Sequence, residues 1–195
     1  MPMNHMQPFS LELDFQTGII RPCNNYIERR LSDMPGMYAD HEAEQKALQG
    51  GDPVIYQVHQ YDVPNENGHL LVVTSTIHAG KIGDEYHMTK GHYHARRDTA
   101  EVYVGLQGQG YLLLCTEEGG FESMPVVPGT ITYIPPYWAH RTVNVGSEDF
   151  IFFGVYPADA GHDYGTIESE GFPMLLVQRD GVPTLVPNPT YGRPA

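Results

Sequence analysis

The sequence predicts an all-β protein whose strands close into a sandwich or barrel, accompanied by a single clear helix. About ten short, strand-like apolar segments follow one another, separated by turn residues. The chain of 195 residues holds 21 Gly and 16 Pro, the frequent punctuation that many-stranded folds need. Its length and its 41% apolar content favour one domain with one ordinary core.

The elements follow in order along the chain. Residues 11–15 alternate apolar and polar side chains and predict an edge strand. Helix formers at 37–48, followed by two glycines, predict a helix on an outer face. Residues 187–195 hold three prolines and are expected to form a surface tail. Turn signals delimit further predicted strands at 54–61, 70–77, 86–94, 100–106, 111–116, 121–127, 130–134, 141–145, 150–155, 174–178 and 183–186.

The net charge of −13 argues against nucleic acid or an anionic membrane as a partner. No apolar run approaches the ~20 residues that span a bilayer. The chain shows no secretory signal pattern, and its two cysteines do not make a disulfide framework. We therefore expect a cytosolic protein that binds neither nucleic acid nor membrane.

Positive charge is nevertheless concentrated in one part of the chain. Five of the 11 Lys and Arg residues bracket the histidine-rich region, which indicates a locally positive site that can accept a phosphorylated metabolite. Arg96 and Arg97 are expected in a solvated turn, and Lys90 is expected to point away from the site because it alternates with Thr89. The five residues are Lys81, Lys90, Arg96, Arg97 and Arg141.

Side chains that bind divalent metals are gathered in two short stretches. His92 and His94 are two residues apart in a predicted strand, so both imidazoles point to one face and can bind one ion. Apolar neighbours place Glu101 on the same face as Tyr103, and one face of a barrel is interior. A buried carboxylate needs a partner. With His140 as a third imidazole, the set suits Fe, Mn, Ni or Zn.

Each of these residues also has an ordinary structural explanation. His92 and His94 would then be surface histidines, Glu101 a solvated strand residue, and His140 a satisfied core histidine. Two imidazoles on one face, followed by an inward carboxylate, favour ligation over these alternatives.

The first stretch resembles the leading motif of the cupin superfamily, a double-sheet jelly roll whose barrel mouth holds one metal. Gly91, His92, His94 and Glu101 match that motif. Six residues separate His94 from Glu101, a longer gap than in most cupins.

The second cupin motif is a proline-containing turn, a histidine and an asparagine. Pro135, His140 and Asn144 match it, whereas Tyr137 stands where many members have glycine. The two motifs imply a single cupin domain over 1–195. Its core is expected at about 50–160, with an N-terminal extension at 1–50, C-terminal strands and tail at 161–195, and one or two short helices.

The longer gap is similar to that of the cupin-type phosphoglucose isomerases, a family first associated with archaea. Residues 89–94 and 100–103 carry the resemblance, and further matching stretches extend it over most of the chain. These stretches are Leu31-Ser32-Asp33-Met34, Pro135-Pro136-Tyr137-Trp138-Ala139-His140, and Val155-Tyr156-Pro157 through His162 and Tyr164.

The resemblance implies a metal-dependent enzyme of glycolysis and gluconeogenesis that interconverts glucose 6-phosphate and fructose 6-phosphate. It implies one divalent metal per subunit, with iron as the first expectation and Mn, Ni or Zn as alternatives. The implied ligands are His92, His94, Glu101 and His140. The implied catalytic residues are Glu101, Tyr103 and His162, and the substrate contacts are Ser75, Thr89, Gly91, Tyr156 and Tyr164.

Two mechanisms remain open at this stage. Glu101 acts as a base at C2 through a cis-enediol, or hydride shifts between carbons while Tyr103 and His162 handle the hydroxyl protons. His162 is equally compatible with a plain loop residue, and several of the 13 tyrosines must be core or rim residues.

Two rival functions belong to other classes. A cupin dioxygenase uses a similar three-His, one-Glu iron site, and a non-catalytic cupin would bind a sugar phosphate without turning it over. Fold membership alone does not separate them. We further expect a homodimer, in which the first fifty residues brace the barrel or exchange between subunits.

Overall fold

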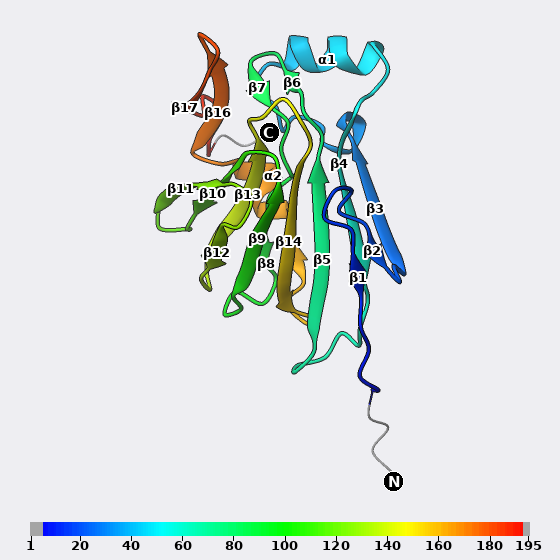
Figure 1. The fold of residues 1–195 in the computed structure, drawn as a ribbon. Helices are drawn as coiled ribbons and strands as arrows, with labels where there is room; N and C mark the ends of the chain where they lie inside the picture. Colours follow the sequence, from blue (N-terminus) through cyan, green and yellow to red (C-terminus); the bar gives the residue numbers. More distant parts are fainter. Residues whose placement is uncertain (1–5, 193–195) are drawn as a thin grey trace.

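The computed structural model of the protein describes residues 6–192, so the outer ends of the predicted N-terminal extension and C-terminal tail lie outside the described residues. Long antiparallel strands lie side by side across the molecule, and a helix crosses one end of them (Figure 1). This is the all-β architecture that the sequence predicts. No helix within residues 6–192 is long and apolar enough to cross a membrane.

The largest sheet has six strands and carries most of the candidate site. In spatial order they are β12 (Ile131–Ile134), β9 (Glu101–Gln107), β14 (Phe150–Pro157), β5 (Leu70–Ile77), β4 (Val54–Tyr61) and β3 (Asn25–Arg30). Burial alternates along β9, so that one face of the sheet is turned to the interior.

Smaller sheets complete the barrel. The three-stranded sheet has the order β11 (Phe121–Val126), β10 (Gly110–Cys115) and β13 (Ala139–Asn144), and the four-stranded sheet has the order β17 (Val182–Pro187), β16 (Met174–Arg179), β7 (Glu85–Tyr86) and β6 (Lys81–Ile82). Two pairs remain, β15 (His162–Asp163) with β8 (Tyr93–His94), and β1 (Glu12–Leu13) with β2 (Ile20–Arg21). Leu112, Val143, Phe150 and Phe152 belong to the single large core cluster that these sheets enclose.

The predicted strand at 86–94 is interrupted, and this interruption positions the first histidine. β7 ends at Tyr86 and β8 begins at Tyr93, and the residues between them run along β13 through two isolated bridges. Gly91 has a φ of +75°, which breaks a regular ladder. The backbone groups are satisfied individually, with Thr89 N–H donating to Thr142 O at 2.9 Å and His92 N–H to His140 O at 3.2 Å.

The helical and N-terminal predictions need three corrections. Helix α1 (His41–Gln49) begins later than predicted, because the Asp40 side chain accepts from Ala43 N–H at 2.9 Å and caps it there. The edge strand predicted at 11–15 is reduced to β1. β3 was not predicted, because its half-buried, charged sequence does not alternate clearly. Short helices η1 (Leu31–Asp33) and α2 (Gly165–Glu170) complete the structure.

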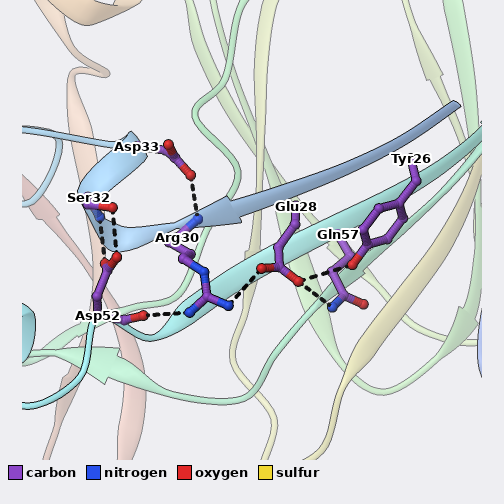
Figure 2. Close-up of polar contacts among 7 residues, drawn as sticks. All are labelled: Tyr26, Glu28, Arg30, Ser32, Asp33, Asp52 and Gln57. Carbon is purple, nitrogen blue, oxygen red and sulfur yellow. Dashed lines mark hydrogen bonds and ion pairs between the residues drawn. The ribbon is translucent and has the colours of Figure 1, made fainter.

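β3 is held in the sheet by a polar network at its end, drawn in Figure 2. Arg30 N–H donates to Asp33 Oδ2 at 2.9 Å, and the Arg30 guanidinium pairs with Glu28 at 2.8 Å. Ser32 donates to both carboxylate oxygens of Asp52, at 2.8 and 2.7 Å. The network therefore fixes the turn from β3 into η1, within the stretch Leu31-Ser32-Asp33-Met34 singled out in the sequence.

Candidate metal centre

Three strands from three different sheets bring the four predicted ligands together. His94 lies on β8, Glu101 opens β9, His140 lies on β13, and His92 is joined to His140 by a two-way backbone bridge. His94, Glu101 and His140 are buried, and His92 is half-buried. One ligand atom from each residue lies within 4.8 Å of all the others.

The Glu101 carboxylate is the centre of this cluster. Its Oε2 lies 3.2 Å from His94 Nε2 and 3.0 Å from His140 Nε2. The His140 contact lacks the geometry of a hydrogen bond, which leaves His140 Nε2 without a hydrogen-bond partner among the described residues. His92 Nε2 is likewise a buried nitrogen without such a partner among them. Buried polar atoms left without a partner are rare in proteins and call for an explanation.

A single divalent ion supplies that explanation. Metal–nitrogen and metal–oxygen distances of about 2.0–2.2 Å place two ligands of one ion at most about 4.4 Å apart, close to the observed spread. Three imidazoles and one carboxylate form the mixed donor set that suits Fe, Mn, Ni or Zn. The residues present therefore fit a metal.

The electrostatics of the cluster agree with this fit. Burial, reinforced by the imidazoles of His140, His162 and His94, holds the pKa of His92 well below its usual value, so its nitrogen lone pair is free. Burial alone would raise the pKa of Glu101, but contacts with His140 and His94 outweigh burial and lower it. Glu101 is thus an ionised carboxylate in the interior.

Gly91 is required by the backbone rather than by its chemistry. At its φ of +75°, an added Cβ would lie 2.7 Å from the Phe172 ring and 3.0 Å from the Arg141 Cβ. A side chain here would push the preceding turn away from β13, and His92 is the next residue.

The second cupin motif has a structural role besides supplying His140. Asn144 is fully buried and donates to the carbonyls of Ile77 and Glu148, both at 2.8 Å, which fastens the end of β13. Tyr137, the departure from the family pattern, has a φ of +70°, the left-handed conformation that glycine adopts most readily. The tyrosine side chain is exposed.

A cavity of about 250 Å³ opens beside the cluster. It brings together all of the residues that the sequence predicted for catalysis and substrate binding. Its lining includes His92, Glu101 and His140 among the ligands, together with Ser75, Thr89, Gly91, Tyr103, Tyr156, His162 and Tyr164.

His162 and Tyr164 form one wall of this cavity. Their rings stack with centroids 5.6 Å apart, and the His162 ring lies 4.4 Å from that of His92. Although His162 is exposed as a whole residue, desolvation of its ring by the surrounding protein and the nearby imidazoles of His94 and His140 lower its pKa to about 4, so the imidazole is neutral at pH 7. Burial, followed by the charge of Glu101, holds the pKa of Tyr103 well above its usual value, so that phenol stays protonated.

Several lining residues were not singled out in the sequence. Tyr56, Val58 and Gln60 lie on β4 and point to the cavity, while Asn25 and Ile27 reach it from β3. The period of two along 54–61 places the β4 residues on one face and was a usable signal. Asn25 and Ile27 had none, because β3 itself was not predicted.

Three basic residues near the site form ion pairs with carboxylates. Lys90 does not line the cavity; its Nζ lies 3.1 Å from Glu168 and 5.9 Å from the centre of the Tyr164 ring. Arg96 and Arg97 lie in a turn, as expected, and their partly exposed side chains form ion pairs. Each arginine has one carboxylate partner far along the chain, Asp159 for Arg96 and Asp163 for Arg97, at separations of 63 and 66 residues. Each also has a nearer one at 3.4 Å, Asp98 for Arg96 and Glu117 for Arg97.

The structure of oxalate decarboxylase from Bacillus subtilis overlaps 55% of this chain and 26% of its own, with a TM-score of 0.45 and 19% identity.

Sequence comparison reaches over nearly the whole chain. The chain is 48% identical over 189 residues to the glucose-6-phosphate isomerase of Thermococcus litoralis, and the match covers 97% of this chain and 99% of that protein. It is 46% identical to the enzyme of the same name from Pyrococcus furiosus, with 96% and 98% covered, and 35% identical to that of Sinorhizobium medicae, with 90% and 82% covered. The profile described as Glucose-6-phosphate isomerase (GPI) matches residues 28–185, and the chain belongs to this glucose-6-phosphate isomerase family.

Proposed function

We propose that this chain is a metal-dependent isomerase that interconverts glucose 6-phosphate and fructose 6-phosphate, a step of glycolysis and gluconeogenesis. The observation that carries the proposal is one cavity that joins the His/Glu cluster to a wall of hydroxyl groups. Such a cavity suits a substrate with a reactive sugar at one end and a phosphate at the other.

The chain's own residues supply the acids and bases for the reaction. The ionised Glu101 takes the proton from C2 of the aldose and returns it to C1, which passes through a cis-enediol of the sugar. Tyr103, a protonated phenol, and His162, a neutral imidazole, line the same cavity and are the proposed groups that pass a proton between O1 and O2. When bound, the metal supplies a Lewis acid that polarises the sugar oxygens.

Thr89 and Ser75 are the proposed contacts for the phosphate. Thr89 Oγ1 accepts from Thr142 N–H at 3.0 Å, which leaves its own hydroxyl proton free to donate. Ser75 lines the same cavity from β5, and the Gly91 backbone adds a further lining group. Neutral donors such as these hold a phosphate in a strongly acidic protein without a cluster of permanent cations.

A coupled assay of fructose 6-phosphate conversion tests the proposal. Activity is expected to be lost on chelation and restored by Fe, Mn, Ni or Zn, and the ion that restores most identifies the preferred metal, expected to be iron. Undiminished turnover by fully demetallated protein would exclude the metal requirement. Oxygen consumption on an enediol substrate would point to a dioxygenase, and tight sugar phosphate binding without turnover would point to a binding protein.

Isotope labelling separates the two mechanisms. Glucose 6-phosphate deuterated at C2 is expected to lose part of its label to water during conversion, because a carboxylate that holds the proton can exchange it. Full retention of the label in the product would favour the hydride shift. The cytosolic location and the homodimer stay predictions from the sequence.

A further inference from the structure

Two consecutive arginines fasten one wall of the cavity to the metal-ligand strand. Arg96 and Arg97 follow directly after His94 and Ala95, and each pairs with a carboxylate on the segment that carries His162. Arg96 pairs with Asp159 before His162, and Arg97 pairs with Asp163 immediately after it. We call segment 159–164 the histidine wall.

Arg97 makes more contacts than an ordinary surface cation. Its Nη1 donates to the carbonyl of His94 at 2.6 Å, and its Nη2 donates to Asp163 Oδ2 at 2.6 Å. The guanidinium also lies 4.3 Å from the centre of the Tyr93 ring. One planar group thus connects a candidate metal ligand to the histidine wall, a geometry that suits arginine rather than lysine.

The position of Asp163 decides where its neighbours point. In extended backbone, successive side chains face opposite sides, so Asp163 faces Arg97 while His162 and Tyr164 face the cavity. Asp163 also accepts from the Thr166 hydroxyl at 2.9 Å and so fixes the start of α2. β15 has only two residues, so its backbone pairing with β8 is short. Side-chain contacts such as that of Asp163 with Arg97 therefore contribute much of what holds this segment in place.

We propose that Arg97 is a positioning residue that holds His162, through Asp163, at its working distance from the metal cluster. The proposal rests on the proposed isomerase function, in which His162 handles a hydroxyl proton. Arg96 fastens the other end of the histidine wall, three residues before His162, and serves as the matched comparison.

Kinetics of four variants test this role. Arg97→Ala and Asp163→Asn are expected to lower kcat by about 10- to 100-fold, because small misplacements of a reacting group are costly. Their KM is expected to change by less than about threefold, because the substrate's ground-state contacts remain. Arg96→Ala and Asp159→Asn are expected to stay within about twofold of the parent, as for a partly exposed ion pair. Added guanidinium ion is expected to restore part of the lost kcat in Arg97→Ala.

A readout independent of turnover keeps the two proposals apart. In zinc-loaded protein, the His162 Cε1–H NMR signal is expected to shift or broaden in Arg97→Ala and to stay unchanged in Arg96→Ala. Equal loss of kcat in the Arg96 and Arg97 variants, or parent-like kcat in Arg97→Ala, would overturn the assignment. If the parent protein fails to isomerise while the His162 signal still responds to Arg97 alone, the proposed function fails and the positioning role stands.

Discussion

His94 and Thr99 are joined so that the tautomer of the histidine is fixed. The Thr99 hydroxyl donates its proton to Arg96 O at 2.7 Å, so its oxygen accepts from His94 Nδ1 at 2.8 Å. The Thr99 carbonyl, which also only accepts, lies 3.2 Å from the same nitrogen. Nδ1 therefore carries a proton, which leaves Nε2, 3.2 Å from Glu101 Oε2, as the ring nitrogen that can bind a metal.

Thr99→Val is expected to weaken metal binding about tenfold, the low end of such effects, because the backbone carbonyl still orients the ring. Activity at saturating metal should remain close to that of the parent. Competition with a chromogenic chelator measures the affinity, and Thr184→Val, on β17, is the control. An unchanged affinity in Thr99→Val would mean that the hydroxyl has no role in ligation.

Gly91→Ala is expected to destabilise the protein by about 2–4 kcal/mol, combining a left-handed backbone with overpacking. Gly119 also has a positive φ, of +87°, but nothing lies within 4 Å of an added Cβ. Gly119→Ala should therefore cost about 1 kcal/mol, from the backbone alone. Urea unfolding of both variants measures the difference, and equal losses would contradict the packing argument.

Glu101→Gln is expected to lower isomerase activity by about 10²–10⁴-fold, since it keeps the shape of the side chain but removes the base. Metal affinity should fall as well, because the amide is a poorer ligand than the carboxylate. Turnover is therefore measured at saturating metal, with bound metal determined for each sample. Activity within a few-fold of the parent under those conditions would remove Glu101 from the chemistry.

Glu85→Gln is expected to stabilise the protein above neutral pH. Burial is the main reason that the pKa of Glu85 rises from 4.5 to about 7; the charge of Glu44 raises it further, while Ala39 N–H and Arg141 oppose the rise. The folded state therefore binds this proton more tightly than the unfolded state, and its stability falls as pH rises from about 4.5 through 7.

The glutamine mimics the protonated acid, so the variant should gain up to about 3 kcal/mol at pH 8 and nothing near pH 4.5. Chemical denaturation across this pH range measures the gain. Glu122→Gln, on the exposed face of β11, is the control and should show no such trend. A gain in stability that does not change with pH would mean that the substitution acts through packing rather than through charge.

Much of the fold was predictable where local signals agree. The strands at 54–61 and 70–77 have the predicted bounds, because Pro and Gly turns delimit alternating apolar runs. The strand at 86–94 is broken because Gly91 leaves the ladder, which periodicity does not reveal. β3 escaped prediction because its pairing with β4, rather than its own sequence, makes it a strand.

The candidate site likewise has parts that the sequence predicts and parts that it does not. A spacing of two residues was enough to place His92 and His94 together, and their convergence with Glu101 follows from closing the sheet. The ion pairs of Arg96 with Asp159 and of Arg97 with Asp163 join residues far apart in sequence, so no local pattern indicates them. Contacts of this kind are settled by tertiary structure alone.

β3, an edge strand of the six-stranded sheet, lines the cavity but carries none of the candidate metal ligands. Asn25 and Ile27 close the cavity from that strand, whereas every candidate ligand lies between residues 92 and 140. Peeling β3 from the sheet would leave the ligands in their places and expose the pocket along one flank. Mobility of that flank would therefore alter how sugars enter and leave without disturbing ion capture.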